Sequence, residues 1–149
     1  MINHSVSQLI FPVSTVLFAI CLTNGCSQEQ QNAVLLRREN LAHLGTSYLE
    51  WSKVKQSSPG NAEEFTQWML ETDNANILGS ARNSLIEGDV IMIWNGDLTD
   101  EPANAGYVVA FEAPTPAKGG YVVMGDASVK LMTAKEFAAS TMLPQRYQE

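Results

Sequence analysis

Charged residues are missing from the first 25 positions of the chain. The nine lysines and arginines, the sixteen aspartates and glutamates, and the net charge of −7 therefore all belong to residues 26–149. The basic residues form no cluster, and the densest groups are Arg37 with Arg38 and Lys53 with Lys55. Because nucleic acids and anionic lipid surfaces are bound by clustered Lys and Arg, the sequence predicts neither as a partner.

Histidine and cysteine are also scarce, with two of each. His43 is the only histidine after the charge-free segment, and we assign it no metal-binding or catalytic role. The sequence contains no G-x-S-x-G, H-E-x-x-H, Walker A or G-x-G-x-x-G motif. Glu63 and Glu64 are adjacent, so on a helix they point in different directions and do not form a carboxylate pair. We therefore expect no enzyme and no cofactor; a hydrolase is the alternative that a pocket of converging polar side chains would favour.

An apolar run of fourteen residues, LIFPVSTVLFAICL, occupies positions 9–22. It is shorter than the roughly 20 residues that a membrane-spanning helix needs, but a secretory signal peptide has an apolar region of roughly 7–15 residues. The segment LTNGC that ends this stretch resembles the lipobox of bacterial lipoproteins. That resemblance implies cleavage between Gly25 and Cys26 and lipidation of the Cys26 thiol. Ser27, by the same resemblance, suits an outer-membrane destination.

Three outcomes are open for Cys26: a lipid anchor, ordinary signal-peptide cleavage that leaves a free thiol, and an uncleaved N-terminal anchor helix. We favour the lipid anchor. Cys21 would leave with the apolar run, so the exported chain would keep one unpaired, reactive thiol unless it is modified. Two or more acyl chains also give durable anchoring. We expect an exported protein of the cell envelope, held to a membrane through Cys26, at the periplasmic face of the outer membrane.

The part after the apolar run is long enough for one domain with its own core. We expect a signal peptide of lipoprotein type at 1–25, a flexible tether at 26–32, a single α+β globular domain at 33–140 and a polar tail at 141–149.

Three helices are predicted in the first half of the globular part. The first covers residues 32–56, and its apolar stripe at i, i+3, i+7 and i+10 consists of Leu41, Leu44, Tyr48 and Trp51. The second begins with Asn61 as N-cap and Glu64 three places on, which is a reciprocal capping arrangement. The third covers residues 76–86.

Strand-like runs dominate the second half. DVIMIW, residues 89–94, has the composition of a strand buried on both faces, and a long loop follows it. Two more strands are expected at 106–112 and 119–125, and the two prolines of APTPAK between them argue against a helix there. SVKLM, residues 128–132, is the last strand, and a Thr133–Glu136 capping box starts a short final helix.

A hairpin is predicted where the last two strands meet, around Gly125 and Asp126. With the turn at Gly125-Asp126, Val122 would face Val129; with the turn at Asp126-Ala127, Val122 would face Leu131. Either register predicts a sheet that is covered on one face and half solvated on the other. Helices followed by strands with short connections indicate an α+β fold. We expect a long amphipathic helix and one or two shorter ones on an antiparallel sheet of three or four strands, with a short C-terminal helix.

Three stretches carry a resemblance to a known family: RRENLAHLGTSYLEW, SSPGNAEEF and GGYVVMGDASVKLMTAKEF. They resemble the pilin-like secreted proteins of planctomycete bacteria, which are related to the globular part of type II secretion pseudopilins. Residues matching the family's helix motif are Asn40, Leu41, Leu44, Gly45 and Tyr48, and those matching its hairpin motif are Val122, Asp126, Val129 and Met132. Ala127 stands where the family's hairpin usually has glycine. The resemblance implies a pilin-like globular domain, here tethered by lipid.

In some pseudopilins, loops at the edge of the sheet bind calcium. By the same resemblance, the loop NGDLTDE is a candidate calcium-binding loop. Oxygen-bearing side chains alternate along it at Asn95, Asp97, Thr99 and Glu101, and Ca²⁺ prefers such ligands. The EF-hand pattern fails at its central glycine position, so an acidic solvated loop is favoured over a metal site.

Taken together, these features predict a lipid-anchored, non-enzymatic envelope protein. Its role would be protein interaction or structure in a secretion or surface-assembly system, with an unidentified envelope protein as partner. An exported module that binds a small ligand or calcium is the alternative.

Overall fold

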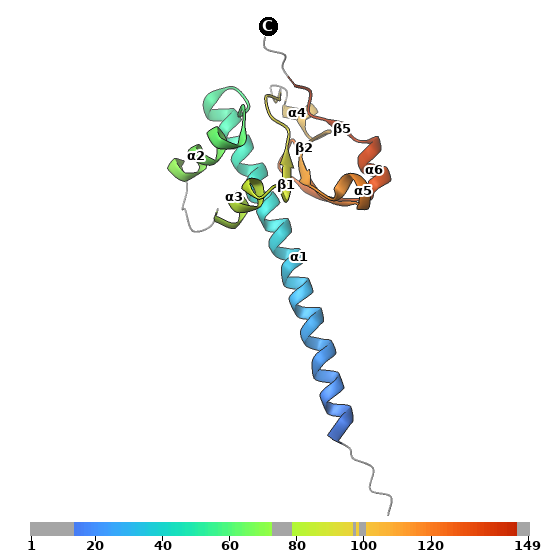
Figure 1. Cartoon of the computed structure of the whole chain (residues 1–149). Helices are drawn as coiled ribbons and strands as arrows, with labels where there is room; N and C mark the ends of the chain where they lie inside the picture. Colours follow the sequence, from blue (N-terminus) through green and yellow to red (C-terminus); the bar gives the residue numbers. More distant parts are fainter. Residues whose placement is uncertain (1–13, 73–78, 97, 99–100, 146–149) are drawn as a thin grey trace, which may run out of the picture. The chain divides into compact units, whose positions relative to one another are not determined.

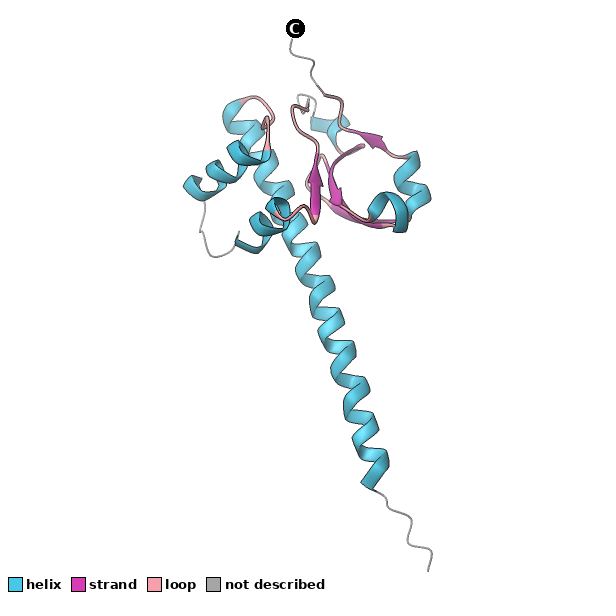
Figure 2. Ribbon diagram, in the orientation of Figure 1, coloured by secondary structure: helices cyan, strands magenta, loops and turns pink. Residues whose placement is uncertain are grey.

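The computed structural model describes residues 14–72, 79–96, 98 and 101–145, with side chains described from residue 28 onward except at 101 and 102. The chain divides into two units, residues 1–35 and 36–149. The helices are α1 (Ser14–Lys55), α2 (Ala62–Thr72), α3 (Gly79–Ile86), α4 (Glu101–Asn104), α5 (Thr115–Lys118) and α6 (Ala134–Ala139). The strands are β1 (Val90–Met92), β2 (Tyr107–Glu112), β3 (Gly120–Met124), β4 (Val129–Met132) and β5 (Thr141–Met142). Figure 1 labels these elements, and Figure 2 colours them by type.

Helix α1 is one continuous helix from Ser14 to Lys55, so the predicted flexible tether at 26–32 is helical. The tether prediction was wrong because this stretch is rich in Gln and Glu, which favour helix, and contains neither Pro nor Gly after Cys26. Within the described residues, none of the helices combines the length and the hydropathy that crossing a membrane requires.

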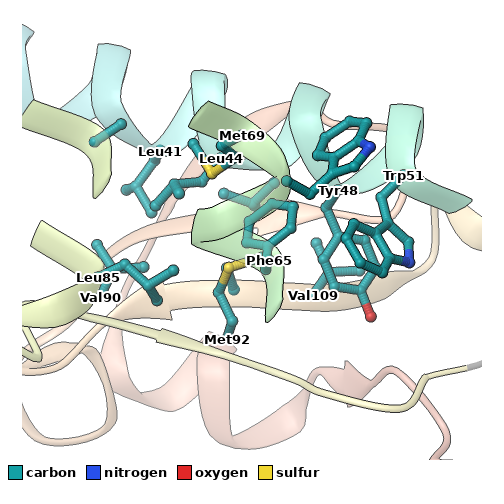
Figure 3. Packing of buried hydrophobic residues seen from close by; sticks show 14 of the residues in the cluster. Leu41, Leu44, Tyr48, Trp51, Phe65, Met69, Leu85, Val90, Met92 and Val109 are labelled. Atoms are coloured by element: carbon teal, nitrogen blue, oxygen red, sulfur yellow. The ribbon is translucent and has the colours of Figure 1, made fainter. Parts of the chain in front are cut away.

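The apolar stripe predicted for the first helix is buried. Leu41, Leu44 and Tyr48 are completely inaccessible and Trp51 nearly so. They pack with residues of α2, β1 and β2 in the main core, as Figure 3 shows. The phenol of Tyr48 donates a hydrogen bond of 2.9 Å to the carbonyl oxygen of Ile93, which ties the helix to the chain just after β1.

The N-terminus of α2 confirms the predicted cap in part. The Glu64 N–H donates to Asn61 Oδ1 at 2.9 Å, as an N-cap requires. The Glu64 carboxylate, however, accepts from the N–H of Gly60 at 3.0 Å, one residue before the expected partner. Helix α3 begins at Gly79, and the first three residues of its predicted range, 76–78, lie outside the described part.

The fold is α+β, as predicted. Strands β1 to β4 form an antiparallel sheet in the order β1-β2-β3-β4, and β5 pairs in parallel with the start of β2. Because β1 pairs with Ala110–Glu112 and β5 with Tyr107 and Val108, both share one edge of β2. Among the described residues, β1 and β4 are therefore the edge strands of the main sheet.

Both faces of the central strands β2 and β3 carry buried residues, which corrects the prediction of one half-solvated face. On one face Val109, Ala110 and Val123 belong to the main core, together with residues of α1, α2 and α3. On the other face a second core consists of Val108, Val122, Met124 and Phe137, the last from α6. The sequence pattern did not predict the second core, because α6 contributes one large apolar side chain to it, Phe137. The ring of Phe137 lies 4.8 Å from that of Phe111.

Strand β2 contains a β-bulge, and its side chains contribute to both cores. Val108 pairs with Met124, but Ala110 pairs with Val123, so Val109 is an extra residue in the ladder. Such a bulge places two consecutive side chains on one face. Val109 and Ala110 accordingly both face α1, while Val108 and Phe111 face α6.

The hairpin between β3 and β4 has neither of the two predicted registers. Val123 faces Val129 and Val122 faces Lys130, which leaves a three-residue loop, Gly125 to Ala127. In such loops the last residue takes the left-handed conformation, and Ala127 does so with φ of 62°. The prediction assumed a two-residue turn with glycine in the left-handed position, but the left-handed residue is the alanine.

Three further predictions need correction. Ile91 in β1 is 41% exposed, so this edge strand is buried on only one face. APTPAK contains the one-turn helix α5, because Pro114 is its N-cap and Pro116 lies in its first turn, where proline is tolerated. The predicted polar tail is not a tail as far as residue 145: β5 joins the sheet, and Leu143 is buried in the main core.

Candidate functional site

A groove of about 680 Å³ opens between α1, α3, the start of β1, the end of β2 and α5. All its lining residues belong to the unit 36–149. Helix α1 contributes Leu36, Arg37 and Asn40; α3 and the turn after it contribute Ser80, Asn83, Ser84 and Glu87; and the sheet side contributes Asp89, Val90, Glu112, Pro114, Lys118 and Gly119. Its volume lies within the range of roughly 300–1,000 Å³ that is usual for ligand sites.

A polar pair joins the two helices at the wall of the groove. The Ser80 hydroxyl donates a hydrogen bond of 2.7 Å to Asn40 Oδ1, and Asn40 is almost inaccessible. The Ser84 hydroxyl donates instead to the Ala81 carbonyl oxygen at 2.8 Å, within α3. The Asn40–Ser80 bond therefore links α3 to α1 beside the groove.

Charges of both signs line the rim. Arg37 Nη1 lies 3.6 Å from Glu112 Oε1, and the other oxygen of Glu112 accepts a hydrogen bond of 2.7 Å from the Tyr121 N–H. Glu112 is thus held at the end of β2 by two groups. Glu87, Asp89 and Lys118 complete the charged lining. Leu36, Val90 and Pro114 contribute apolar surface to the same lining.

Groups with shifted pKa values lie elsewhere in the fold. Burial raises the pKa of Tyr48, whose phenol serves as a structural hydrogen-bond donor. The hydroxyl and then the N–H of Ser128 lower the pKa of Asp126, and the N–H and then the hydroxyl of Thr133 lower that of Glu136. Each shift has a local structural cause in a turn, a cap or the core.

Cys26, the predicted lipidation site, and Gly25, the residue before the predicted cleavage, belong to helix α1. The side chain of Cys26 lies outside the described part. Lipidation of Cys26 and cleavage after Gly25 therefore stay predictions.

The calcium candidates are only partly described. Asp97 and Thr99 lie outside the described residues, and Glu101 begins α4 with its side chain also outside them. Asn95 has a φ of 56° and donates from Nδ2 to the Gly60 carbonyl oxygen at 3.4 Å, so its amide takes part in a loop contact. Among the residues described, no group of three His, Cys, Asp or Glu side chains is placed to hold a metal ion.

The three tryptophans, Trp51, Trp68 and Trp94, belong to one aromatic cluster around Phe65. The rings of Trp51 and Trp68 lie 5.4 Å apart, and Phe65 lies 6.0 Å from Trp94 and 6.3 Å from each of the other two. Trp51 and Trp68 are buried. This cluster fills the space between α1 and α2 with aromatic packing.

The sequence predictions missed the groove, although one signal was present. Polar residues recur in α3 and its last turn at i, i+3, i+4 and i+7, and these are Ser80, Asn83, Ser84 and Glu87, the four that line the groove. Such a stripe marks one face of a helix. Ala81 and Leu85 mark the buried edge of the same helix.

No family model matches the chain, and neither a curated protein nor a solved structure matches it.

Proposed function

We propose that this chain is a lipid-anchored, non-enzymatic protein of the cell envelope, whose pilin-like globular domain binds another envelope protein in a secretion or surface-assembly system. The main observation that supports this proposal is the groove. It joins apolar surface to carboxylates and cations, of which Arg37 and Glu112 form an ion pair.

Both faces of the central strands β2 and β3 pack against other parts of the protein, so we place the proposed contact at the groove. The groove, in contrast, is bordered by Leu36, which is 50% exposed. Partly exposed apolar residues surrounded by polar ones are typical of protein interaction sites.

The membrane attachment in this proposal is supported by the sequence. An apolar run of signal-peptide length precedes Gly25 and Cys26, and the polar residues that follow continue α1. Cleavage there would leave Cys26 at the start of the helix, with the acyl chains on its thiol.

A comparison of two variants of α1 tests the role of the groove. Leu36→Asp places a charge at the groove, whereas Val54→Asp places one on the same helix at a residue that is 67% exposed and does not line the groove. Each protein is used as bait in detergent-solubilised envelope from the native host. The proposal predicts that one partner is retained by the native chain and by Val54→Asp and lost by Leu36→Asp. Equal retention by both variants, or turnover of a screened substrate with no partner, would contradict it.

The size of the groove also favours a second candidate, an exported protein that binds a small ligand. A ligand within the groove would protect the protein thermally by mass action. Screening a panel of zwitterionic and neutral solutes against the native chain and Leu36→Asp would support this function if a solute raised only the native melting temperature. Calorimetric titration with Ca²⁺ tests the loop at Asn95 separately, and a titration without heat would remove calcium binding.

A further inference from the structure

Strand β4 leaves one side of its backbone without a strand partner. It is the last strand in the order β1-β2-β3-β4, so within the described residues only β3 pairs with it. The Met124 N–H donates to the Ser128 carbonyl oxygen at 2.9 Å, which fixes which residues face β3. Because antiparallel pairing alternates, Lys130 and Met132 also direct their backbone groups toward β3. Val129 and Leu131 direct theirs outward.

This free edge has defined ends. On one side the Ser128 N–H is bonded to Asp126 Oδ1 at 2.9 Å, within the hairpin turn. On the other the Thr133 N–H is bonded to the Glu136 carboxylate at 2.7 Å, in the cap of α6. Within the part of the chain that the structure describes, no strand pairs with the outward N–H and C=O groups of Val129 and Leu131 between these ends, and these groups form a template for one short extended segment.

The side chains of β4 indicate which segment fits. Leu131 is 70% exposed, so it presents apolar surface beside the free backbone groups. Lys130 is exposed on the opposite face of the strand, and its positive charge also helps to lower the pKa of Asp126. A residue directly opposite Lys130 on an added antiparallel strand would lie in a non-hydrogen-bonded pair, where side chains are closest.

A second copy of this chain is a poor occupant of that edge. Antiparallel pairing about the middle of β4 would set the Lys130 residues of the two copies against each other, and like charges directly opposite destabilise a sheet. A carboxylate at the same position would instead be attracted. We infer that β4 binds an extended segment of another protein by strand addition, with an acidic residue opposite Lys130 and an apolar residue opposite Leu131. This surface is separate from the groove and does not depend on it.

The probe for this inference is a synthetic seven-residue peptide of alternating threonine and valine with one glutamate at its centre, flanked directly by valines. A matched peptide carries lysine at the centre. The full chain, ¹⁵N-labelled and purified in detergent, is titrated with each peptide and followed by amide NMR shifts. We expect the outward-facing amides of Val129 and Leu131 to shift most, and those of Lys130 and Met132 to shift less. The glutamate peptide should bind about fivefold more tightly than the lysine peptide, because opposite and like cross-strand charges differ by this order.

Three variants separate strand addition from loss of structure. Leu131→Pro removes only an outward N–H, which an edge strand tolerates, and should abolish binding, whereas Leu131→Thr keeps the N–H and should bind. Lys130→Glu should reverse the preference and bind the lysine peptide more tightly, which a damaged fold would not do. Equal binding of both peptides by every variant, shifts confined to groove residues, or no shifts at all would overturn the inference.

Discussion

Gly45 of α1 lies so close to Val123 of β3 that a Cβ atom on the glycine would stand 2.5 Å from Val123 Cγ1 and 3.4 Å from the Cβ of Ala127. The helix and the hairpin are therefore in contact at the one position of α1 between Leu44 and Tyr48 that lacks a side chain. This contact explains why a glycine, which weakens a helix, occupies the buried face of a long one.

Replacing Gly45 tests this contact. Gly45→Ala should lower the free energy of unfolding by up to about 2 kcal/mol, because overpacking costs about 1–3 kcal/mol and the helix gain of about 1 kcal/mol offsets only part of it. Chemical denaturation measures the change. Gly79→Ala in α3 is the matched control, since nothing lies within 4 Å of its added Cβ, and it should be neutral or stabilising. A stabilised Gly45→Ala would show that helix and hairpin are further apart.

Ala127 is strained in the hairpin loop because its φ of 62° is a conformation that residues with a Cβ disfavour. Ala127→Gly should raise the free energy of unfolding by up to about 1 kcal/mol, since the relief of roughly 1–2 kcal/mol exceeds the entropy that glycine adds to the unfolded chain. Ala127→Val should lower it. If thermal unfolding ranked the glycine variant below the native protein, the left-handed loop would be refuted.

Leu143 anchors the C-terminal segment in the main core. Leu143→Ala should lower the free energy of unfolding by about 2–4 kcal/mol through lost burial and a residual cavity. Leu70→Ala, at a side chain that is 44% exposed, should change it by no more than about 0.5 kcal/mol. Similar small losses for both would mean that residues after α6 are a tail after all.

The cap of α6 should respond to pH. Folding lowers the pKa of Glu136 below its ordinary value of 4.5, because the Thr133 N–H and hydroxyl donate to the charged carboxylate. A lowered folded-state pKa gives a stabilising contribution that is present above the unfolded value and is lost as the pH falls through the folded one. NMR titration of the Glu136 carboxyl should show the lowered value, and Thr133→Ala should return it toward 4.5. An unchanged midpoint in the variant would contradict the cap.

Local patterns predicted most of the elements and the fold class. The stripe from Leu41 to Trp51, the Asn61 cap and the Thr133–Glu136 box are short-range signals, and each is present in the structure. Two predictions failed, the register of the hairpin and the half-solvated face of the sheet. The hairpin register follows from Ala127 taking a left-handed conformation, which propensity disfavours, and the second core requires Phe137 to fold back over Val122.

The candidate site was less predictable than the fold. The groove is formed by α1, α3, α5 and the sheet, and no segment of sequence contains it. Its one local sign is the polar stripe of α3. The free edge of β4 likewise follows from the strand order, because the sequence of SVKLM does not tell whether a strand is central or at the edge.

Anchoring of the protein to the envelope through Cys26 is tested most directly by the intact mass of the native protein, extracted from its own cells. We expect a chain that begins at Cys26 and carries the added mass of two or three acyl chains, and a Cys26→Ser variant that keeps its N-terminal segment. A native chain that retains Met1 and carries no acyl mass on Cys26 would contradict it.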